Sequence, residues 1–197
     1  MRAIVLSLVA ALVPAYPAGA DRPSDTLLTR PRQILLIRHA EKPDDDQDIH
    51  LSPKGKARAE VLPWLFRKTA DRPDPFPRPD FLFATKESKH SNRPVETVTP
   101  LARELNLFLS ADVADNDFGQ LAAELLTNPK YGDKTVLVCW HHGQLPNLAR
   151  ALKATGVPDE FNKDHFDRVW VVSYDGQGNG KPLDKRHQEL LPGDSKH

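Results

Sequence analysis

The 197-residue chain has little cysteine, no net charge and no long apolar run outside its first residues. Cys139 is its only cysteine, so no disulfide forms within the chain and stability must come from packing. Basic and acidic residues number 27 each, which makes the formal net charge zero. Such a chain has no overall field to attract nucleic acid or an anionic membrane, and neither is expected as a partner. Any preference for an anionic ligand must come from a local cluster of arginines and histidines.

The apolar run near the N-terminus is well short of the roughly 20 residues that a membrane-spanning helix needs. Arg2 precedes the apolar stretch 3–13, and Ala18-Gly19-Ala20 has the small-x-small pattern of a cleavage site. We therefore predict a signal peptide over 1–20 and a periplasmic or secreted protein that is free of the membrane after cleavage. An uncleaved N-terminal anchor is the alternative.

The rest of the chain alternates between short apolar runs and helical patterns, without an internal repeat. Residues 21–32 are polar and predict a leader, and residues 33–197 predict a single domain. Strands are expected at 33–38, 81–84, 136–140 and 169–172, and helices from Ser52-Pro53, from about Pro94, over 119–127 and over 145–152. This alternation predicts an α/β fold, a three-layer sandwich with a mostly parallel central sheet and helices on both faces.

Two pairs of polar residues follow apolar strands directly. Arg38-His39 comes after one strand and His141-His142 after another, while Arg93 lies between a third strand and its helix. In a parallel sheet the carboxyl ends of strands share one edge, where ligands gather. Guanidinium groups bind phosphate oxygens in bidentate fashion, and a neutral imidazole can attack phosphorus. The pattern predicts a phosphate pocket with a histidine nucleophile.

Four segments resemble, in order, motifs of the histidine phosphatase superfamily, which has the phosphoglycerate-mutase-like fold. The first resembles its Arg-His-Gly/Ala signature and the second its Leu-Ser/Thr-x-x-Gly-x-x-Arg/Gln-Ala helix start. The third resembles the segment of its second phosphate arginine, and the fourth the strand that delivers its second histidine. They are Leu36 to Pro43, Leu51 to Ala59, Arg93 to Thr97 and Val136 to Gly143.

The resemblance implies a role for each matching residue. His39 is the phosphoryl acceptor, and the phosphoryl group is bound by Arg38, Arg93 and His142. His142 is chosen because the family has glycine directly after its second histidine, and Gly143 follows His142. His141 is then expected to point away from the pocket. Cys139 lies inside an apolar strand, where a buried core residue is favoured over a thiol nucleophile.

Because glycine and not aspartate follows the second histidine, the resemblance implies that the proton donor belongs to the stretch after the second arginine. Asp112, Asp115 and Asp117 all lie there. We choose Asp117, directly before Phe118, and the other two stay open. A positioned general acid contributes roughly 10²- to 10⁴-fold in rate.

The resemblance therefore implies an exported phosphomonoesterase that hydrolyses a small phosphate ester through a phosphohistidine on His39. Neither a metal nor another cofactor is expected, and the lack of a long insert over the site favours hydrolysis over transfer. A phospholigand-binding protein on the same fold, with little or no turnover, is the alternative. A metal-dependent enzyme is a third interpretation, since paired histidines and acids can ligate zinc.

Overall fold

A single mixed sheet forms the centre of the structure. The computed structural model describes residues 30–45 and 47–195, so the predicted signal peptide lies outside the described residues. In that part of the chain six strands follow the order β3-β2-β4-β1-β5-β6. Their bounds are β1 (Gln33–Arg38), β2 (Phe81–Ala84), β3 (Leu109–Ser110), β4 (Thr135–Trp140), β5 (Arg168–Ser173) and β6 (Asp184–His187).

The strands that carry the predicted site are parallel. β1 and β2 both pair with β4 in parallel, and β3 pairs in parallel with β2. β5 pairs antiparallel with β1, and β6 antiparallel with β5. The carboxyl ends of β1, β2 and β4 therefore lie at one edge of the sheet. The mostly parallel α/β sandwich expected from the sequence is confirmed.

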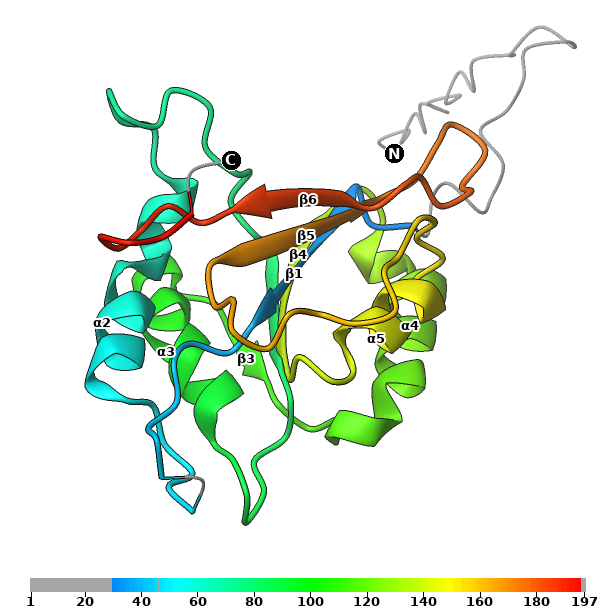
Figure 1. The fold of residues 1–197 in the computed structure, drawn as a ribbon. Helices are drawn as coiled ribbons and strands as arrows, with labels where there is room; N and C mark the ends of the chain where they lie inside the picture. The colour runs from blue at the N-terminus through cyan, green and yellow to red at the C-terminus, as the bar shows by residue number, and fades with distance from the viewer. Residues whose placement is uncertain (1–29, 46, 196–197) are drawn as a thin grey trace, which may run out of the picture.

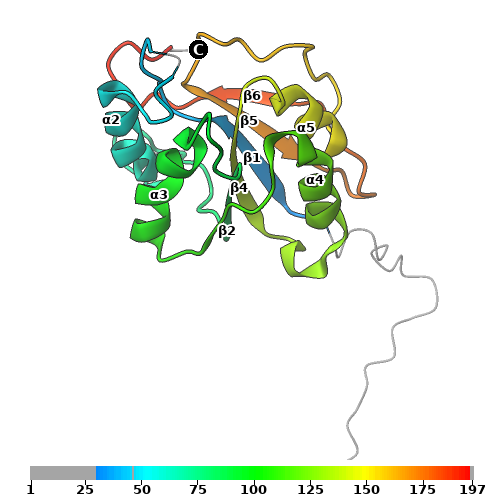
Figure 2. The ribbon, with the colours of Figure 1, turned by 90° about the horizontal axis from the view of Figure 1, so that it is seen from below.

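Helices cover both faces of this sheet. The α-helices are α2 (Pro53–Val61), α3 (Arg93–Leu105), α4 (Phe118–Thr127) and α5 (Leu145–Ala151), with short 3-10 helices η1 (Leu62–Phe66), η2 (Asp115–Asp117) and η3 (Pro129–Tyr131). Helices α2 and α3 lie on one side of the sheet and α4 and α5 on the other (Figures 1 and 2). None of the helices within the described residues is long and apolar enough to cross a membrane.

Strand β1 is apolar without alternation because both of its faces are covered. Ile34 and Leu36 pack into the core beneath α4 and α5. Leu35 and Ile37 point to the opposite face, into the core beneath α3 and η1. Side chains alternate along a strand, so only a continuous apolar run satisfies both layers. This burial fixes β1 and therefore the position of the two residues that follow it.

Helix α2 begins where Ser52 and Pro53 predict. The Ser52 hydroxyl accepts a hydrogen bond from the Gly55 amide, and Pro53 occupies the first turn, where no amide hydrogen is needed. The helix lies so close to the chain after β1 that a Cβ added to Gly55 would stand 2.3 Å from the carbonyl oxygen of Glu41. Glycine is required at this position by its contact with Glu41, two residues after His39.

Candidate active site

Strands β1 and β4 end side by side and bring their polar residues together. Arg38 is paired with Trp140 in the strand register, and the His39 amide donates to the Trp140 carbonyl over 3.1 Å. His39 therefore leaves β1 at the level where His141 leaves β4. The shared sheet edge expected from the sequence is present.

The His39 imidazole is held in one tautomer. Its Nδ1 lies 2.7 Å from the Ala40 carbonyl oxygen, which can only accept, so Nδ1 carries the hydrogen and Nε2 keeps its lone pair. His39 is only 3% exposed. Burial lowers the pKa of His39 well below its usual range, and the charges of Arg38 and Arg93 lower it further. The ring is neutral near pH 7, as a nucleophile requires.

The Arg38 guanidinium is oriented by the loop before β5. It donates from Nη1 to the Lys163 carbonyl, and its Cζ lies 3.8 Å from the centroid of the Phe166 ring. Its Nε is buried and has no hydrogen-bond partner among the described residues. Burial lowers the pKa of Arg38 to about 10, so the group stays charged at neutral pH. A buried guanidinium with an unused N–H is suited to binding an oxyanion.

Arg93 reaches the same edge from the start of α3. Its Nη1 donates to the Asp48 carbonyl over 2.7 Å, and its Nη2 lies 3.5 Å from the His90 carbonyl. Its charge lowers the pKa values of Arg38 and His39. Arg38, Arg93 and His39 thus interact electrostatically with one another, although the chain as a whole is neutral.

The two adjacent histidines of the fourth segment differ in position. The His141 ring lies edge-on to that of His39, with centroids 5.3 Å apart. Burial, with Arg93 next, lowers the pKa of His141 to about 4. The expectation that His141 points away from the pocket is therefore wrong. His142 lines a neighbouring cavity, and burial and the nearby Arg38 lower its pKa too.

That cavity, of about 640 Å³, opens beside His142. Gly143 also lines it, and an added Cβ there would meet no atom within 4 Å. Further lining residues come from the segment before β5 that also holds Arg38. They include the polar and charged side chains of Glu160, Asn162, Lys163 and Asp164, together with the apolar Phe161.

The three acidic candidates also differ in environment. Asp112 and Asp117 are exposed, and Asp117 directly precedes α4. Asp115 is half-buried, and its carbonyl accepts from the Trp140 indole over 3.2 Å, which places it against the end of β4. Burial raises the pKa of the Asp115 carboxyl to about 6, and its Oδ1 is buried without a hydrogen-bond partner among the described residues. These features favour Asp115 over Asp117 as a proton donor.

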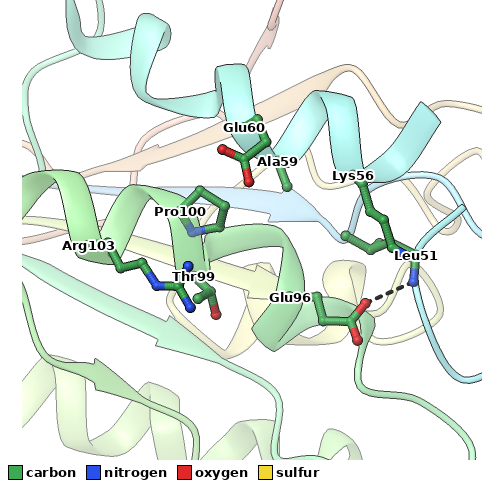
Figure 3. Close-up of a pocket in the computed structure, with 8 residues that line it drawn as sticks. All are labelled: Leu51, Lys56, Ala59, Glu60, Glu96, Thr99, Pro100 and Arg103. Atoms are coloured by element: carbon green, nitrogen blue, oxygen red, sulfur yellow. Dashed lines mark hydrogen bonds between the residues drawn. The ribbon is translucent and has the colours of Figure 1, made fainter. Parts of the chain in front are cut away.

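A second cavity, of about 210 Å³, lies between α2 and α3 (Figure 3). The Glu96 carboxylate crosses it to accept from the Leu51 amide over 2.9 Å. Lys56, Glu60 and Arg103 line it together with Leu51, Ala59 and Pro100, and none of the predicted site residues lies there. This cavity lies between two helices and is separate from His39 and His141.

Two further interpretations concern Cys139 and metals. Cys139 is fully buried in β4, and burial raises the pKa of its thiol, so it is a core residue. Across residues 30–45 and 47–195, no group of three or more His, Cys, Asp or Glu side chains is arranged to hold a metal ion.

Two features of the site had no signal in the sequence. The Phe166 ring stacks on Arg38, and its centroid lies 6.2 Å from that of the His39 ring. The sequence did not indicate this contact, because residues 164–167 form no recognisable motif. Arg58 belongs to the second motif, where glutamine or arginine is expected, but nothing in its spacing indicated which groups it binds. Both contacts join segments far apart in the chain.

Comparison with known proteins rests on structure alone. No protein-family model and no curated protein sequence matches the chain. Among solved structures, the protein histidine phosphatase SixA in complex with tungstate aligns with a TM-score of 0.52 and 20% identity, over 79% of this chain and 97% of that one. SixA from Agrobacterium tumefaciens aligns with a TM-score of 0.50, again at 20% identity, over 79% and 98%.

A mycobacterial glucosyl-3-phosphoglycerate phosphatase, solved with inorganic phosphate, aligns with a TM-score of 0.52 and 14% identity. The alignment covers 79% of this chain and 95% of that one. At such identities the likeness shows a shared fold. The coverage means that the fold extends over nearly the whole of each of these structures.

Proposed function

Because the chain has the fold of the histidine phosphatases, we propose that it is an exported phosphomonoesterase that hydrolyses a small phosphate ester through a phosphohistidine on His39. The observation that carries the proposal is the state of His39. Its Nε2 holds a free lone pair, because Nδ1 donates to Ala40, and it lies within the field of two arginines. A neutral nucleophile beside paired guanidinium groups is what transfer of a dianionic phosphoryl group requires.

In the first step, His39 Nε2 attacks phosphorus and the bond from phosphorus to the ester oxygen breaks. Arg38 and Arg93 bind the phosphoryl oxygens and stabilise the charge that spreads over them in the transition state. His141, neutral and edge-on to His39, donates a hydrogen bond to the same group. His142, first assigned that role, lines the cavity that receives the leaving group.

The departing alkoxide takes a proton from Asp115, whose raised pKa keeps part of its population protonated near neutrality. In the second step, the Asp115 carboxylate accepts a proton from water. The water oxygen attacks the phosphohistidine, the N–P bond breaks, and inorganic phosphate and neutral His39 are released. The two steps leave the protein unchanged and consume one water.

The leaving group would occupy the cavity of about 640 Å³ beside His142. Because polar and charged side chains line this cavity beside Pro146 and Phe161, it can bind the hydroxyl or charged groups of an alcohol as well as its carbon skeleton. The proposed export rests on the signal peptide predicted over 1–20, and periplasmic or secreted location follows from it. Cell fractionation with and without residues 1–20 tests the location separately from the chemistry.

Rapid acid quench with a ³²P-labelled ester tests the intermediate. We expect an acid-labile, base-stable phosphoenzyme that is absent from His39→Ala. Turnover without any labelled protein would exclude a phosphohistidine. Turnover that persists after thorough chelation is expected, and its loss would instead favour the metal-dependent interpretation.

Comparison of the wild-type protein with site variants distinguishes catalysis from ligand binding. A phospholigand-binding protein would hold inorganic phosphate and lose it on Arg38→Ala or Arg93→Ala, while releasing no phosphate from esters beyond the level of His39→Ala. Release above that level over a panel of phosphomonoesters supports the enzyme and identifies the leaving group.

A further inference from the structure

Arg58 is the centre of a buried ionic network between the residue after Ala40 and the C-terminal segment. It is 2% exposed and lies on the buried face of α2. Its Nε and Nη2 bind both Glu41 carboxylate oxygens, at 3.0 and 2.8 Å. Its Nη1 and Nη2 bind both oxygens of Asp194, at 2.8 and 2.7 Å, and Nη1 also reaches Gln188 Oε1 at 3.3 Å. Each N–H of the guanidinium has a partner.

The charges of this network are compensated. Burial opposes ionisation of all three groups, but the hydrogen bonds outweigh it: they raise the pKa of Arg58, lower that of Glu41, and lower that of Asp194 to about 2. Lys54 lies 3.5 Å from Glu41 and balances the second carboxylate. A buried pair loses its compensation if one partner is removed, so each group depends on the others.

The backbone beside Glu41 is fixed from several directions. The Glu41 carbonyl accepts from the Ser52 amide at 3.0 Å, and the Ala40 amide donates to Thr97 Oγ1 at 2.9 Å. Arg58 holds the side chain of Glu41 in addition. The Ala40 carbonyl between these anchors is the group that accepts from His39 Nδ1.

The other end of the network is the segment that follows β6. Asp194 Oδ2 also accepts from the amides of Leu190 and Leu191, at 2.9 and 3.1 Å, which closes this segment into a loop. The loop lies beside α2 in both views (Figures 1 and 2). Residues 188–194 are thus linked to Glu41, two residues after His39, through two carboxylates and one guanidinium.

We propose that Arg58 is a positioning residue: with Asp194 it clamps Glu41 and so fixes the Ala40 carbonyl that sets the His39 tautomer. The proposal rests on the proposed function for its kinetic consequence, but the tautomer itself is independent of turnover. The C-terminal segment is then part of the support of the active site. Which imidazole nitrogen carries the hydrogen is set by the partner of the other nitrogen.

Two variants weaken the clamp with little change of volume. Asp194→Asn removes one charge, and Arg58→Lys keeps the charge but loses the fork that holds two carboxylates at once. The matched control is Asp133→Asn, because both carboxylate oxygens of Asp133 also accept hydrogen bonds from one arginine, Arg32, at 3.0 and 2.9 Å. That pair is exposed and lies at the amino ends of β1 and β4, whereas His39 follows the carboxyl end of β1. The control removes the same chemistry far from His39.

The first measurement is the His39 tautomer, followed by long-range ¹H–¹⁵N correlation spectra of the imidazoles, with His39→Ala for assignment. We expect the wild type and Asp133→Asn to hold the hydrogen on Nδ1. Asp194→Asn and Arg58→Lys should show a mixture of tautomers. Both variants are studied well below their thermal unfolding midpoints. The tautomer of His39 in either variant that folds is enough to test the positioning role. If neither folds at any temperature, the network is a folding element and the positioning role is overturned.

The second measurement is the split between kcat and KM. Misplacing a reacting group slightly can cost up to about 100-fold in rate, so kcat should fall about 10- to 100-fold while the affinity for inorganic phosphate changes less than about twofold. Folded variants with wild-type tautomer and kcat would overturn the positioning role. A wild-type protein that shows the Nδ1 tautomer but no phosphoenzyme would overturn the proposed function and leave the clamp standing.

Discussion

The ring of Phe166 lies against the Arg38 guanidinium, with the arginine Cζ 3.8 Å from the ring centroid. The Lys163 carbonyl, three residues earlier in the same loop, accepts from Nη1 of that arginine. One segment thus contacts both the face and the edge of the Arg38 guanidinium. Cation–π contacts of this kind contribute about 0.5–2 kcal/mol, depending on how dry they are.

Phe166→Ala is therefore expected to weaken the binding of inorganic phosphate by about 2- to 30-fold, with a smaller effect on kcat. The cause is loss of the stacked surface that holds Arg38, and the range is the cation–π energy converted at 1.4 kcal/mol per tenfold change. Isothermal titration calorimetry measures the affinity. Phe108→Ala, at an 84% exposed residue outside the site, is the control. Equal phosphate affinity in both variants would show that Phe166 does not orient Arg38.

Asp115→Asn and Asp117→Asn separate the two acids. Asparagine cannot donate the proton, so Asp115→Asn should lower kcat by roughly 10²- to 10⁴-fold for an ester with a poor leaving group. Asp117→Asn, at an exposed residue, should change kcat by less than about threefold. An ester whose leaving group needs no proton should rescue Asp115→Asn. The reverse ranking of the two variants would return the role to Asp117.

The pH dependence of kcat/KM should show an optimum on the acid side of neutrality. Asp115 acts while protonated, and its pKa near 6 makes activity fall as the pH rises through that value. His39 acts while neutral, and its lowered pKa places the opposite limb well below the ordinary histidine range.

The alkaline limb near pH 6 should disappear in Asp115→Asn, while the acid limb is retained. Ionisation of the substrate is the same for both proteins, so the difference between the two profiles isolates Asp115. A limb near pH 6 that survives the substitution would assign it to another group.

Substituting alanine for glycine should have opposite effects at two helical positions. Gly55→Ala places a Cβ 2.3 Å from the Glu41 carbonyl oxygen, and overpacking of this kind typically costs about 1–3 kcal/mol of unfolding free energy. In Gly119→Ala the Cβ meets no atom within 4 Å, so the helix preference of alanine should stabilise α4 by up to about 1 kcal/mol. Urea denaturation of both variants gives the signs. Equal effects would mean that α2 moves away from Glu41 without cost.

Much of the fold follows from local pattern. The four apolar strands, β1, β2, β4 and β5, were each expected from a short apolar run. β3 and β6 were not expected, because β3 has two residues and β6 has the polar sequence Asp-Lys-Arg-His at the edge of the sheet. An edge strand needs no buried face, so it carries little hydrophobic signal.

The sequence by itself determined that Arg38 and His39 lie at the carboxyl edge of the sheet, because they stand at the end of a buried parallel strand. The position of Arg93, between a third strand and its helix, indicated that it reaches the same edge. Only the tertiary structure shows that the His141 ring lies against His39 and that Asp115 is more buried than Asp117. Neighbouring side chains on one segment point in different directions, and which of them becomes buried depends on what packs against it. For the same reason, motifs and spacing could not predict the Arg38–Phe166 and Arg58–Asp194 contacts. Each contact joins residues more than a hundred positions apart.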